Sequence, residues 1–276
     1  MNRPAGIVTI LPVGRLIAIP VYNEQRYVAQ VLDKVRPYGL DVLVIDDGST
    51  DQTPLLLARQ PVDVIRHAAN RGYGRSIRDA FRWANCYDYE WLITMDCDEQ
   101  HEPESLSDFN AAMDRDDADV ISGSRYLEAD PYGDQPPPDR RDINARVTGW
   151  INDRLGLAIT DSFCGFKAYR VSALKKLALD ESGYAFPLQF WVQTVANDLR
   201  VREIPIRLIY NDPNRSFGGR LDDAGQRLSH YRSVFERELA RFPGRFGEAT
   251  CAPYAPDAER AAGSTSPQKR DHVPAP

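Results

Sequence analysis

Cysteine is scarce in this chain of 276 residues, and its four cysteines are spread along the sequence. They form no C-x-x-C pair, and none has the spacing to the histidines that a zinc site requires. The sequence therefore indicates neither a structural zinc nor the disulfide framework of a small secreted protein. We expect a protein of the reducing cytoplasm.

Long apolar runs are also absent. Apolar stretches such as Leu16–Ile19 and Val42–Ile45 are far shorter than the roughly 20 residues that a membrane-spanning helix needs. The N-terminal stretch Ile7–Leu11 is too brief for a signal peptide. We predict no transmembrane segment.

Basic runs and two nucleotide-binding motifs are missing as well. The net charge is −6, and no dense run of lysine and arginine occurs, so we predict no nucleic-acid partner. The turn after Ile19 has no glycine, Gly72-x-Gly74 is only part of a G-x-G-x-x-G motif, and G-K-[ST] does not occur. These absences argue against a dinucleotide-dependent oxidoreductase and a phosphate-loop NTPase.

What the first half contains is a regular alternation of strands and helices. Arg15–Ile19 and Asp41–Ile45 are apolar and bounded by turn residues, and Tyr27–Val35 between them has helical spacing. The pattern then repeats, with strands near Val62–Ile65, Trp91–Met95 and Asp119–Ile121 and helices near Ser76–Ala84 and Pro103–Arg115. This order predicts an α/β fold with a mostly parallel, Rossmann-like sheet flanked by helices and ligands at the strands' carboxyl ends.

The second half is less regular. A long polar loop is expected over residues 130–138, followed by a helix at Asp142–Leu155, a strand at Val201–Tyr210 and a charged helix at Leu221–Phe242. From Pro243 onward the composition lacks any apolar period. We therefore expect one domain over residues 1–242 and a disordered tail over residues 243–276.

Polar residues follow the first two strands. Tyr22 and Glu24 come after the first strand, where they could stack on and hydrogen-bond a base, although Asn and Glu also favour helix starts. Asp46 and Asp47 end the second strand, which is more carboxylate than a helix cap requires. The pattern indicates a nucleotide site, with an ordinary turn as the alternative at Tyr22.

A pair of aspartates follows the strand that ends at Met95. Asp96 and Asp98 are two positions apart and point the same way at a strand end, and Gln100 offers a further oxygen. Oxygen ligands of this kind suit Mg²⁺ or Mn²⁺, with substrate phosphates completing the shell. Asp is also common in turns. The run therefore predicts a divalent-cation site, and this prediction is supported by the polar residues that follow the neighbouring strands.

Arg125 follows the next predicted strand, in the stretch Ser122–Tyr126. An arginine beside a metal-bound diphosphate supplies bidentate contacts to phosphate oxygens. The alternative is a surface ion pair.

Several stretches between residues 15 and 220 together resemble the family 2 glycosyltransferases of the GT-A fold, and within them the dolichol-phosphate (polyprenyl-phosphate) mannosyltransferase-like branch. They are IPVYNE, VIDDGSTD, NRGYG, MDCDEQHEP, SGSRY, DSFCGFKAYR, GYAFPLQF and EIPI followed by RSFGG. The resemblance implies inverting transfer of a sugar from a nucleotide diphosphate sugar, GDP-mannose or a UDP-sugar, to a polyprenyl phosphate. It also implies at most peripheral contact with the inner face of a membrane.

The resemblance implies roles for individual residues. The nucleoside would be surrounded by Pro20, Tyr22, Glu24 and Asp47. The metal would be held by Asp96, Asp98 and Gln100. Arg125 would contact the diphosphate, Arg140 or Arg141 would reach donor or acceptor phosphates from a mobile loop, and Asp161 would stand beside the reacting sugar.

Two departures from the family pattern leave the acceptor open. Gln189 stands where the branch usually has glutamate, and Phe217 stands where it has lysine, so Arg207 or Arg215 would have to supply the charge. One alternative is a hydroxyl acceptor, which needs a base, with Asp161 as the candidate. The other is a non-catalytic protein that binds nucleotide sugars.

Overall fold

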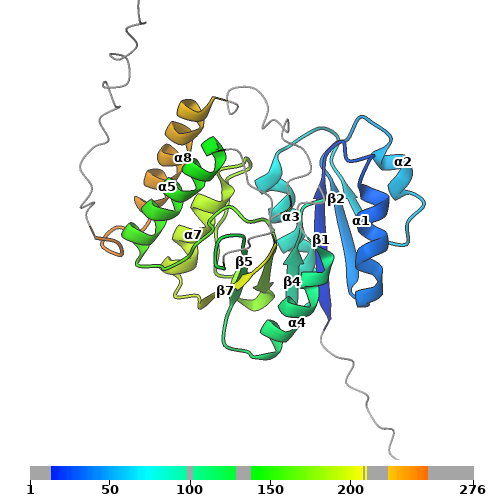
Figure 1. Cartoon of the computed structure of the whole chain (residues 1–276), viewed down its shortest axis with the longest axis horizontal. Helices are drawn as coiled ribbons and strands as arrows, with labels where there is room; N and C mark the ends of the chain where they lie inside the picture. Colours follow the sequence, from blue (N-terminus) through cyan, green and yellow to red (C-terminus); the bar gives the residue numbers. More distant parts are fainter. Residues whose placement is uncertain (1–13, 98–101, 129–137, 208, 210–222, 248–276) are drawn as a thin grey trace, which may run out of the picture. The chain divides into compact units, whose positions relative to one another are not determined.

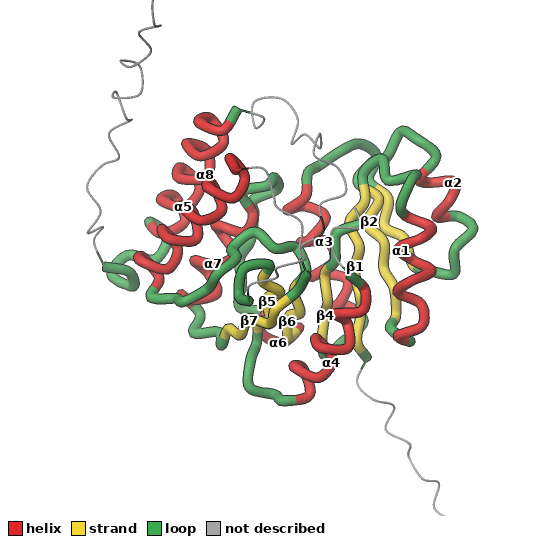
Figure 2. The backbone as a smooth tube through the Cα atoms, viewed as in Figure 1, coloured by secondary structure: helices red, strands yellow, loops and turns green. Residues whose placement is uncertain are grey.

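The computed structural model describes residues 14–97, 102–128, 138–207, 209 and 223–247. Its strands form one seven-stranded sheet in the order β3-β2-β1-β4-β6-β5-β7 (Figures 1 and 2). The strands are β1 (Arg15–Val21), β2 (Asp41–Asp46), β3 (Asp63–Arg66), β4 (Trp91–Thr94), β5 (Val120–Ser124), β6 (Lys167–Arg170) and β7 (Val201–Pro205).

The sheet is mostly parallel, as predicted. β1 pairs in parallel with both β2 and β4, β2 with β3, and β5 with β7. β6 is the exception, because it runs antiparallel between β4 and β5. β6 was not predicted from the sequence, because two of its four residues are charged.

Alternate residues of the inner strands face two separate cores. Leu16 and Ala18 of β1 belong to one core, whereas Ile17 and Ile19 belong to the other, and all four side chains are fully buried. Because both faces of the sheet are covered, the strands appear in the sequence as continuous apolar runs. The helices that cover them are α1 (Val28–Val35), α2 (Thr53–Leu57), α3 (Tyr73–Cys86), α4 (Leu106–Asp114), α5 (Pro138–Leu155), α6 (Val171–Leu174), α7 (Phe186–Ala196) and α8 (Ala224–Leu239).

The helices divide between the two faces of the sheet. α3 packs on β1, β2 and β4, and α5, α7 and α8 pack on one another beside it (Figure 1). α1 and α4 contribute to the second core. Short 3₁₀ turns extend two of these segments, η1 (Arg36–Tyr38) and η2 (Pro103–Ser105).

Several predicted boundaries were wrong by a few residues. α3 begins at Tyr73 instead of Ser76, because Gly72 takes a positive φ of 96° and ends the preceding loop. α5 begins at Pro138 instead of Asp142, since proline suits the first helical turn. β7 ends at Pro205, and residues 208 and 210 of the longer predicted strand lie outside the described residues.

Parts of the predicted second half are only partly described. Of the expected tail, residues 243–246 form turns and a bend, and the residues after 247 lie outside the described residues, as does most of the polar loop before α5. No helix among the described residues is both long enough and apolar enough to cross a bilayer.

Candidate active site

The loops after β1 and β2 are joined by hydrogen bonds. The Asn23 amide N–H donates to Ser49 Oγ at 2.9 Å, and its side-chain Oδ1 accepts from the Thr50 N–H at 2.8 Å. Asn23 has a positive φ of 59°, which asparagine tolerates better than most residues. The two predicted nucleotide loops are therefore one unit.

The residues predicted around the nucleoside differ in exposure. Tyr22 is 45% exposed, so its ring is open to solvent, whereas Glu24 is buried and its carbonyl accepts from the first turn of α1. Pro20 is half-buried in β1. Asp47 lies at the same edge, since its N–H donates to the Val21 carbonyl at 2.9 Å. The exposed ring of Tyr22 suits stacking on a base.

Asp47 organises the loop before α3. Its carboxylate accepts from the Arg71 and Gly72 amides, each at 2.8 Å, and lies 2.6 Å from His67 Nδ1. The other ring nitrogen of His67 lies 3.0 Å from Asp79 Oδ2. A carboxylate has about four acceptor positions, so Asp47 retains room for about one further donor, such as a base N–H.

Asp46 serves the fold of this loop. Its side chain is fully buried, and Oδ1 accepts from the Ser49 N–H at 2.8 Å while Oδ2 lies 3.2 Å from Arg66 Nε. The two adjacent aspartates therefore have different tasks: Asp46 closes its own turn, and Asp47 holds a distant one.

Asp96 lies at the end of β4 against Gly165. A Cβ added at Gly165 would stand 2.3 Å from Asp96 Oδ2, so only glycine leaves the carboxylate its place. Burial, and after it the negative charge of Asp96, raises the pKa of Tyr73. Burial is also the main cause of the raised pKa of Tyr169, to which the charge of Asp96 adds a smaller contribution. Gly165 thus leaves space for the Asp96 carboxylate, whose charge reaches the phenol of Tyr73.

The predicted metal site is described only in part. Asp96 is half-buried and offers the hard oxygen ligand that Mg²⁺ and Mn²⁺ prefer. Asp98 and Gln100 lie outside the described residues. Within the described part, no group of three or more His, Cys, Asp or Glu side chains is placed to hold a metal. The placement of Asp96 fits a divalent cation, whose other ligands remain a prediction.

Arg125 and Asp161 form a bidentate ion pair. Arg125 Nε donates to Asp161 Oδ2 at 2.6 Å, and Nη2 donates to Oδ1 at 2.9 Å. The Asp161 side chain is fully buried, and that of Arg125 is 17% exposed. The Arg125 charge holds the pKa of Asp161 well below its usual range, against the opposing effect of burial. Nη1 of Arg125 donates to no described residue.

Three more donors saturate the Asp161 carboxylate. They are the backbone N–H of Arg125 at 3.3 Å, Asn144 Nδ2 at 2.8 Å and the backbone N–H of Phe163 at 3.2 Å. Five donors exceed the acceptor positions of a carboxylate. A buried, saturated carboxylate with a lowered pKa is a poor proton acceptor, so this geometry argues against Asp161 as a catalytic base. It makes Asp161 the residue that orients Arg125.

Arg140 and Arg141 belong to the first turn of α5, not to a loop as expected. Arg141 is exposed, and its charge lowers the pKa of Tyr126, although burial has the larger effect and raises it. Tyr126 follows Arg125 directly. Asn144, one turn later on α5, donates to Asp161. The structure therefore brings the start of α5 to the Arg125–Asp161 pair, a contact that sequence spacing could not reveal.

Gln189 is structural in this chain. Its Oε1 accepts from the Asp180 and Glu181 amides, each at 2.8 Å, and its Nε2 donates to Glu238 Oε2 at 2.7 Å. Gln193 donates to the other Glu238 oxygen at 2.6 Å. All three side chains are at most 1% exposed. The negative charge in this place is supplied from α8 by Glu238, which explains why an amide stands at position 189.

This buried cluster supports the loop over residues 178–183. The Ser182 carbonyl accepts from the Arg75 N–H at 3.2 Å and lies 2.4 Å from a Cβ added at Gly72. Gly72 in turn donates to Asp47. Gln189 therefore acts from a distance on the loop that holds Asp47, and Phe217 lies outside the described residues.

Arg207 and Glu203 complete the description of this region. Arg207, expected to replace a missing cation, pairs with Glu102 at 3.0 Å. Glu203 on β7 accepts from the Thr160 and Asp161 amides and so fixes the segment before β6. Burial raises the pKa of Glu203. Roles for Glu203, Asn144 and His67 were not predicted. Asn144 and His67 stand in no recognised motif, and the EIPI stretch that begins at Glu203 does not indicate its partners.

Comparison with known proteins gives the class. Residues 16–178 match the family model described as Glycosyl transferase family 2. The polyprenol monophosphomannose synthase of Mycolicibacterium smegmatis is 31% identical over 210 residues, covering 72% of this chain and 78% of that protein. The undecaprenyl-phosphate mannosyltransferase of Micrococcus luteus is 32% identical over 213 residues, covering 73% of this chain and 86% of that protein.

A solved structure confirms the fold. Glucosyl-3-phosphoglycerate synthase from Mycobacterium tuberculosis, solved with Mg²⁺ and uridine diphosphate, matches with a TM-score of 0.60 and 16% identity, covering 85% of each chain. Together with the sheet and the match to the family model, this defines a GT-A protein. The chain belongs to glycosyltransferase family 2 and is a glycosyltransferase. The predicted resemblance to the polyprenyl-phosphate branch is confirmed by its relatives.

Proposed function

We propose that this chain transfers a sugar from a nucleotide diphosphate sugar to a polyprenyl phosphate, with inversion at the anomeric carbon. The observation that carries the choice of acceptor is the saturated carboxylate of Asp161. Two relatives support the same class of acceptor. They are the polyprenol monophosphomannose synthase and the undecaprenyl-phosphate mannosyltransferase described above.

The two kinds of acceptor differ in the proton that the acceptor oxygen carries. A hydroxyl acceptor loses its proton during transfer and needs a base, whereas a phosphate monoester loses its second proton near pH 6 and arrives ionised. Asp161 is engaged by five donors and has a lowered pKa. A site without an available carboxylate base at this position suits an acceptor that needs none.

The donor would lie across the ends of β1, β2 and β4. Tyr22 would stack on the base, and the remaining acceptor position of Asp47 would receive a base N–H. A divalent cation, Mg²⁺ or Mn²⁺, would be held by Asp96 with Asp98 and Gln100, and it supplies neutralisation of charge on the leaving diphosphate. The solved relative that contains Mg²⁺ and uridine diphosphate supports such a cofactor.

The leaving diphosphate would also be held by arginine. Nη1 of Arg125 faces no described partner, so it can donate to a phosphate oxygen while Asp161 keeps the guanidinium in place. Arg141 at the start of α5 would contact the acceptor or donor phosphate. The acceptor phosphate oxygen then displaces the nucleoside diphosphate in one step, which inverts the configuration.

The test compares two acceptors that differ only in the phosphate. The full chain is incubated with Mn²⁺, with GDP-mannose or a UDP-sugar in turn, and with undecaprenyl phosphate or undecaprenol. We expect transfer to the phosphate, none to the alcohol, and loss of transfer in Asp96→Asn. Transfer to undecaprenol at a comparable rate would refute the proposed acceptor.

A second readout separates an enzyme from a protein that only binds nucleotide sugars. A nucleoside diphosphate with Mn²⁺ is expected to raise the melting temperature of the wild type and not of Asp96→Asn. Such a shift without turnover on any donor would favour the non-catalytic alternative. Because polyprenyl phosphates are membrane lipids, we place the chain in the cytoplasm, at the inner face of the membrane.

A further inference from the structure

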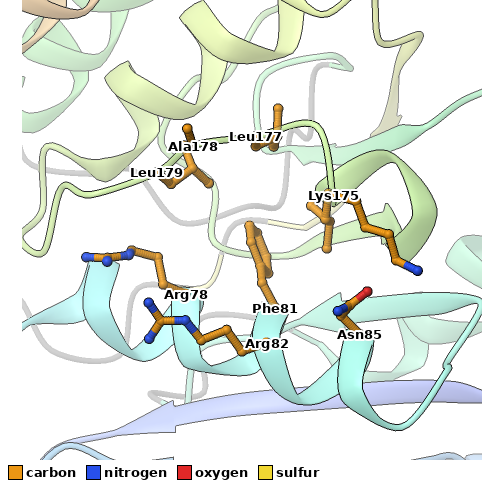
Figure 3. A pocket seen from close by; sticks show the side chains of 9 residues that line it. Arg78, Phe81, Arg82, Asn85, Lys175, Leu177, Ala178 and Leu179 are labelled. Carbon is orange, nitrogen blue, oxygen red and sulfur yellow. The ribbon is translucent and has the colours of Figure 1, made fainter.

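A groove on the flank of α3 has no part in the site described above. It lies between α3 and the segment that follows α6, and its volume is about 250 Å³. In Figure 3, Arg78 and Arg82 project from α3 and Lys175 from the facing segment, while Phe81 stands between the two sides. Ligand sites of drug-like size measure roughly 300–1,000 Å³, so the groove is too small for a nucleotide sugar.

The charge of this groove is positive. Its nine lining residues include three cations and no carboxylate. Arg82 and the nearby Arg75 share the carboxylate of Asp79, whereas Arg78 donates to the carbonyl of Asp180 and keeps its full charge. Burial lowers the pKa of Arg78, and the charges of Arg82 and Arg75 lower it further.

The acidic groups around the groove do not cancel this charge. Asp180 lies in the segment after α6, close to the groove. Its Oδ1 accepts from Gln189 Nε2, and its Oδ2 lies 3.7 Å from Arg241 Nη1. Asp79 points toward His67 and is held there at 3.0 Å. The three cations of the groove, Arg78, Arg82 and Lys175, together with the adjacent Arg75, therefore outnumber the two nearby carboxylates, Asp79 and Asp180. In a chain of net charge −6, this is a local reversal of sign.

The floor of the groove is apolar. Phe81, Leu174, Leu177 and Leu179 line it, between the basic residues on either side. A free phosphate would leave this apolar surface uncovered, whereas a phospholipid brings a phosphate and the glycerol and acyl carbons beneath it. The combination of charge and apolar surface suits an anionic lipid.

The groove begins close to the transfer site. Arg78 lies five positions after Tyr73, which is about 7.5 Å along the helix axis at 1.5 Å per residue. The charge of Asp96 acts on Tyr73. Arg78 is therefore the part of the groove nearest the transfer site. The rest of the lining extends away from that site, because Lys175 follows α6 and β6, whose Arg170 pairs with Trp91 at the start of β4.

We propose that the groove formed by Arg78, Arg82, Lys175 and the apolar side chains between them is the docking site for the head groups of an anionic phospholipid surface. This inference rests on the proposed function, because a polyprenyl phosphate is reached only in a membrane. It places the membrane contact on α3 and the segment after α6.

The test is a vesicle flotation assay with the full chain and no donor. A lysine or arginine near an anionic membrane surface contributes about 1 kcal/mol to binding, a factor of about five. The wild type is expected to bind vesicles of phosphatidylglycerol and phosphatidylcholine, and to bind vesicles of phosphatidylcholine alone far more weakly. Arg78→Gln with Lys175→Gln should lower the partition coefficient on the anionic vesicles about thirtyfold.

Two further variants keep the result interpretable. Arg59→Gln with Arg115→Gln removes the same charge from exposed residues outside the groove, and its partition coefficient should stay within about twofold of the wild type. Lys175→Gln alone, at an exposed position, should cause a loss of about fivefold even if the Arg78 substitution impairs folding. Equal binding to both kinds of vesicle, or an equal loss in the Arg59 and Arg115 variant, would overturn the proposal.

The assay is independent of transfer. Turnover of undecaprenyl phosphate dissolved in detergent tests the proposed function without a membrane, and flotation tests the groove without turnover. If the wild type transfers sugar in detergent but does not float with anionic vesicles, the proposed lipid-docking role of the groove is refuted and the proposed function is not.

Discussion

Two buried aspartates, Asp47 and Asp161, stand at opposite parts of the site and are held in different ways. Asp47 accepts from the backbone amides of Arg71 and Gly72 and contacts one histidine. Asp161 accepts a bidentate guanidinium and three further donors. An aspartate therefore organises a loop in one place and neutralises a partly buried arginine in the other.

The difference has energetic consequences. Removing one partner of a buried ion pair leaves an uncompensated charge and costs about 3–5 kcal/mol. Removing one acceptor of backbone amides costs about 1–3 kcal/mol, since each amide can find part of its bonding elsewhere. Stability should thus depend more on the Arg125–Asp161 pair, and the order of the loop before α3 more on Asp47.

The largest expected effect is that of Arg125→Met. It leaves the fully buried Asp161 without its cation, so the free energy of unfolding should fall by about 3–5 kcal/mol in urea denaturation. Arg125→Met with Asp161→Leu should recover part of the loss, because no charge is then left buried. A loss under 1 kcal/mol in the single variant would contradict the role given to the pair.

The pH dependence tests the same pair. The pKa of Asp161 in the folded chain lies below that of an unfolded aspartate, about 3.9. Its contribution is therefore fully present above the unfolded pKa and is lost as the pH falls through the folded pKa. The stability difference between wild type and Arg125→Met should shrink as urea denaturation is repeated from pH 7 down to pH 3.

Gly165→Ala is expected to affect activity more than stability. The added Cβ would stand 2.3 Å from Asp96 Oδ2, so the carboxylate has to move. We expect transfer to fall by at least about a hundredfold, with overpacking costing about 1–3 kcal/mol. Gly149→Ala is the matched control, because a Cβ there meets nothing within 4 Å. It should keep full activity and stabilise α5 by about 0.5–1 kcal/mol.

Gln189→Glu should destabilise the second half of the domain. Gln189 Nε2 now donates to Glu238 Oε2 at 2.7 Å. A carboxylate in its place cannot donate, so two negatively charged groups would lie next to each other without this hydrogen bond. We expect the free energy of unfolding to fall by about 2 kcal/mol. Glu238→Gln in the same chain should restore most of it, which a double-mutant cycle would measure. Strictly additive losses would show that the two side chains do not interact.

The smallest stability effect is expected for Asp47→Asn. The amide cannot accept from both Arg71 and Gly72 in the present geometry, at a cost of about 1–2 kcal/mol. The affinity for a nucleoside diphosphate, measured by calorimetry, should nevertheless fall about tenfold. If unfolding is affected as strongly as by Arg125→Met, the contrast between the two aspartates is wrong.

The first half of the fold was predictable because its patterns are local. β1 and β2 are apolar runs with turn residues at both ends, and the residues that follow them carry the nucleotide motifs. The resemblance to family 2 predicted the roles of the motifs that follow along the chain. The placements of Asp47 and Asp96 at strand ends follow from these patterns, and the roles of Asp98 and Gln100 stay predictions.

The second half was harder because its contacts are remote in sequence. α7 was not predicted, since its residues are almost all buried and show no polar face. The saturation of Asp161 depends on Asn144 from α5 and on Arg125, which directly follows β5. Gln189 contacts Glu238, 49 positions away in the sequence. No spacing rule in a single sequence announces such pairs, so the suitability of Asp161 as a base could be judged only from the structure.

The antiparallel strand β6 has a consequence for how the chain acquires its fold. β4 and β5 do not pair with each other, and β6 lies between them, so residues 167–170 have to arrive before the two parts of the sheet can join. Arrival of β6 also delivers Gly165 to Asp96 and Asp161 to Arg125. During synthesis the surroundings of Asp96 and Arg125 would therefore be completed together at a late step, when the sheet closes around its last inner strand.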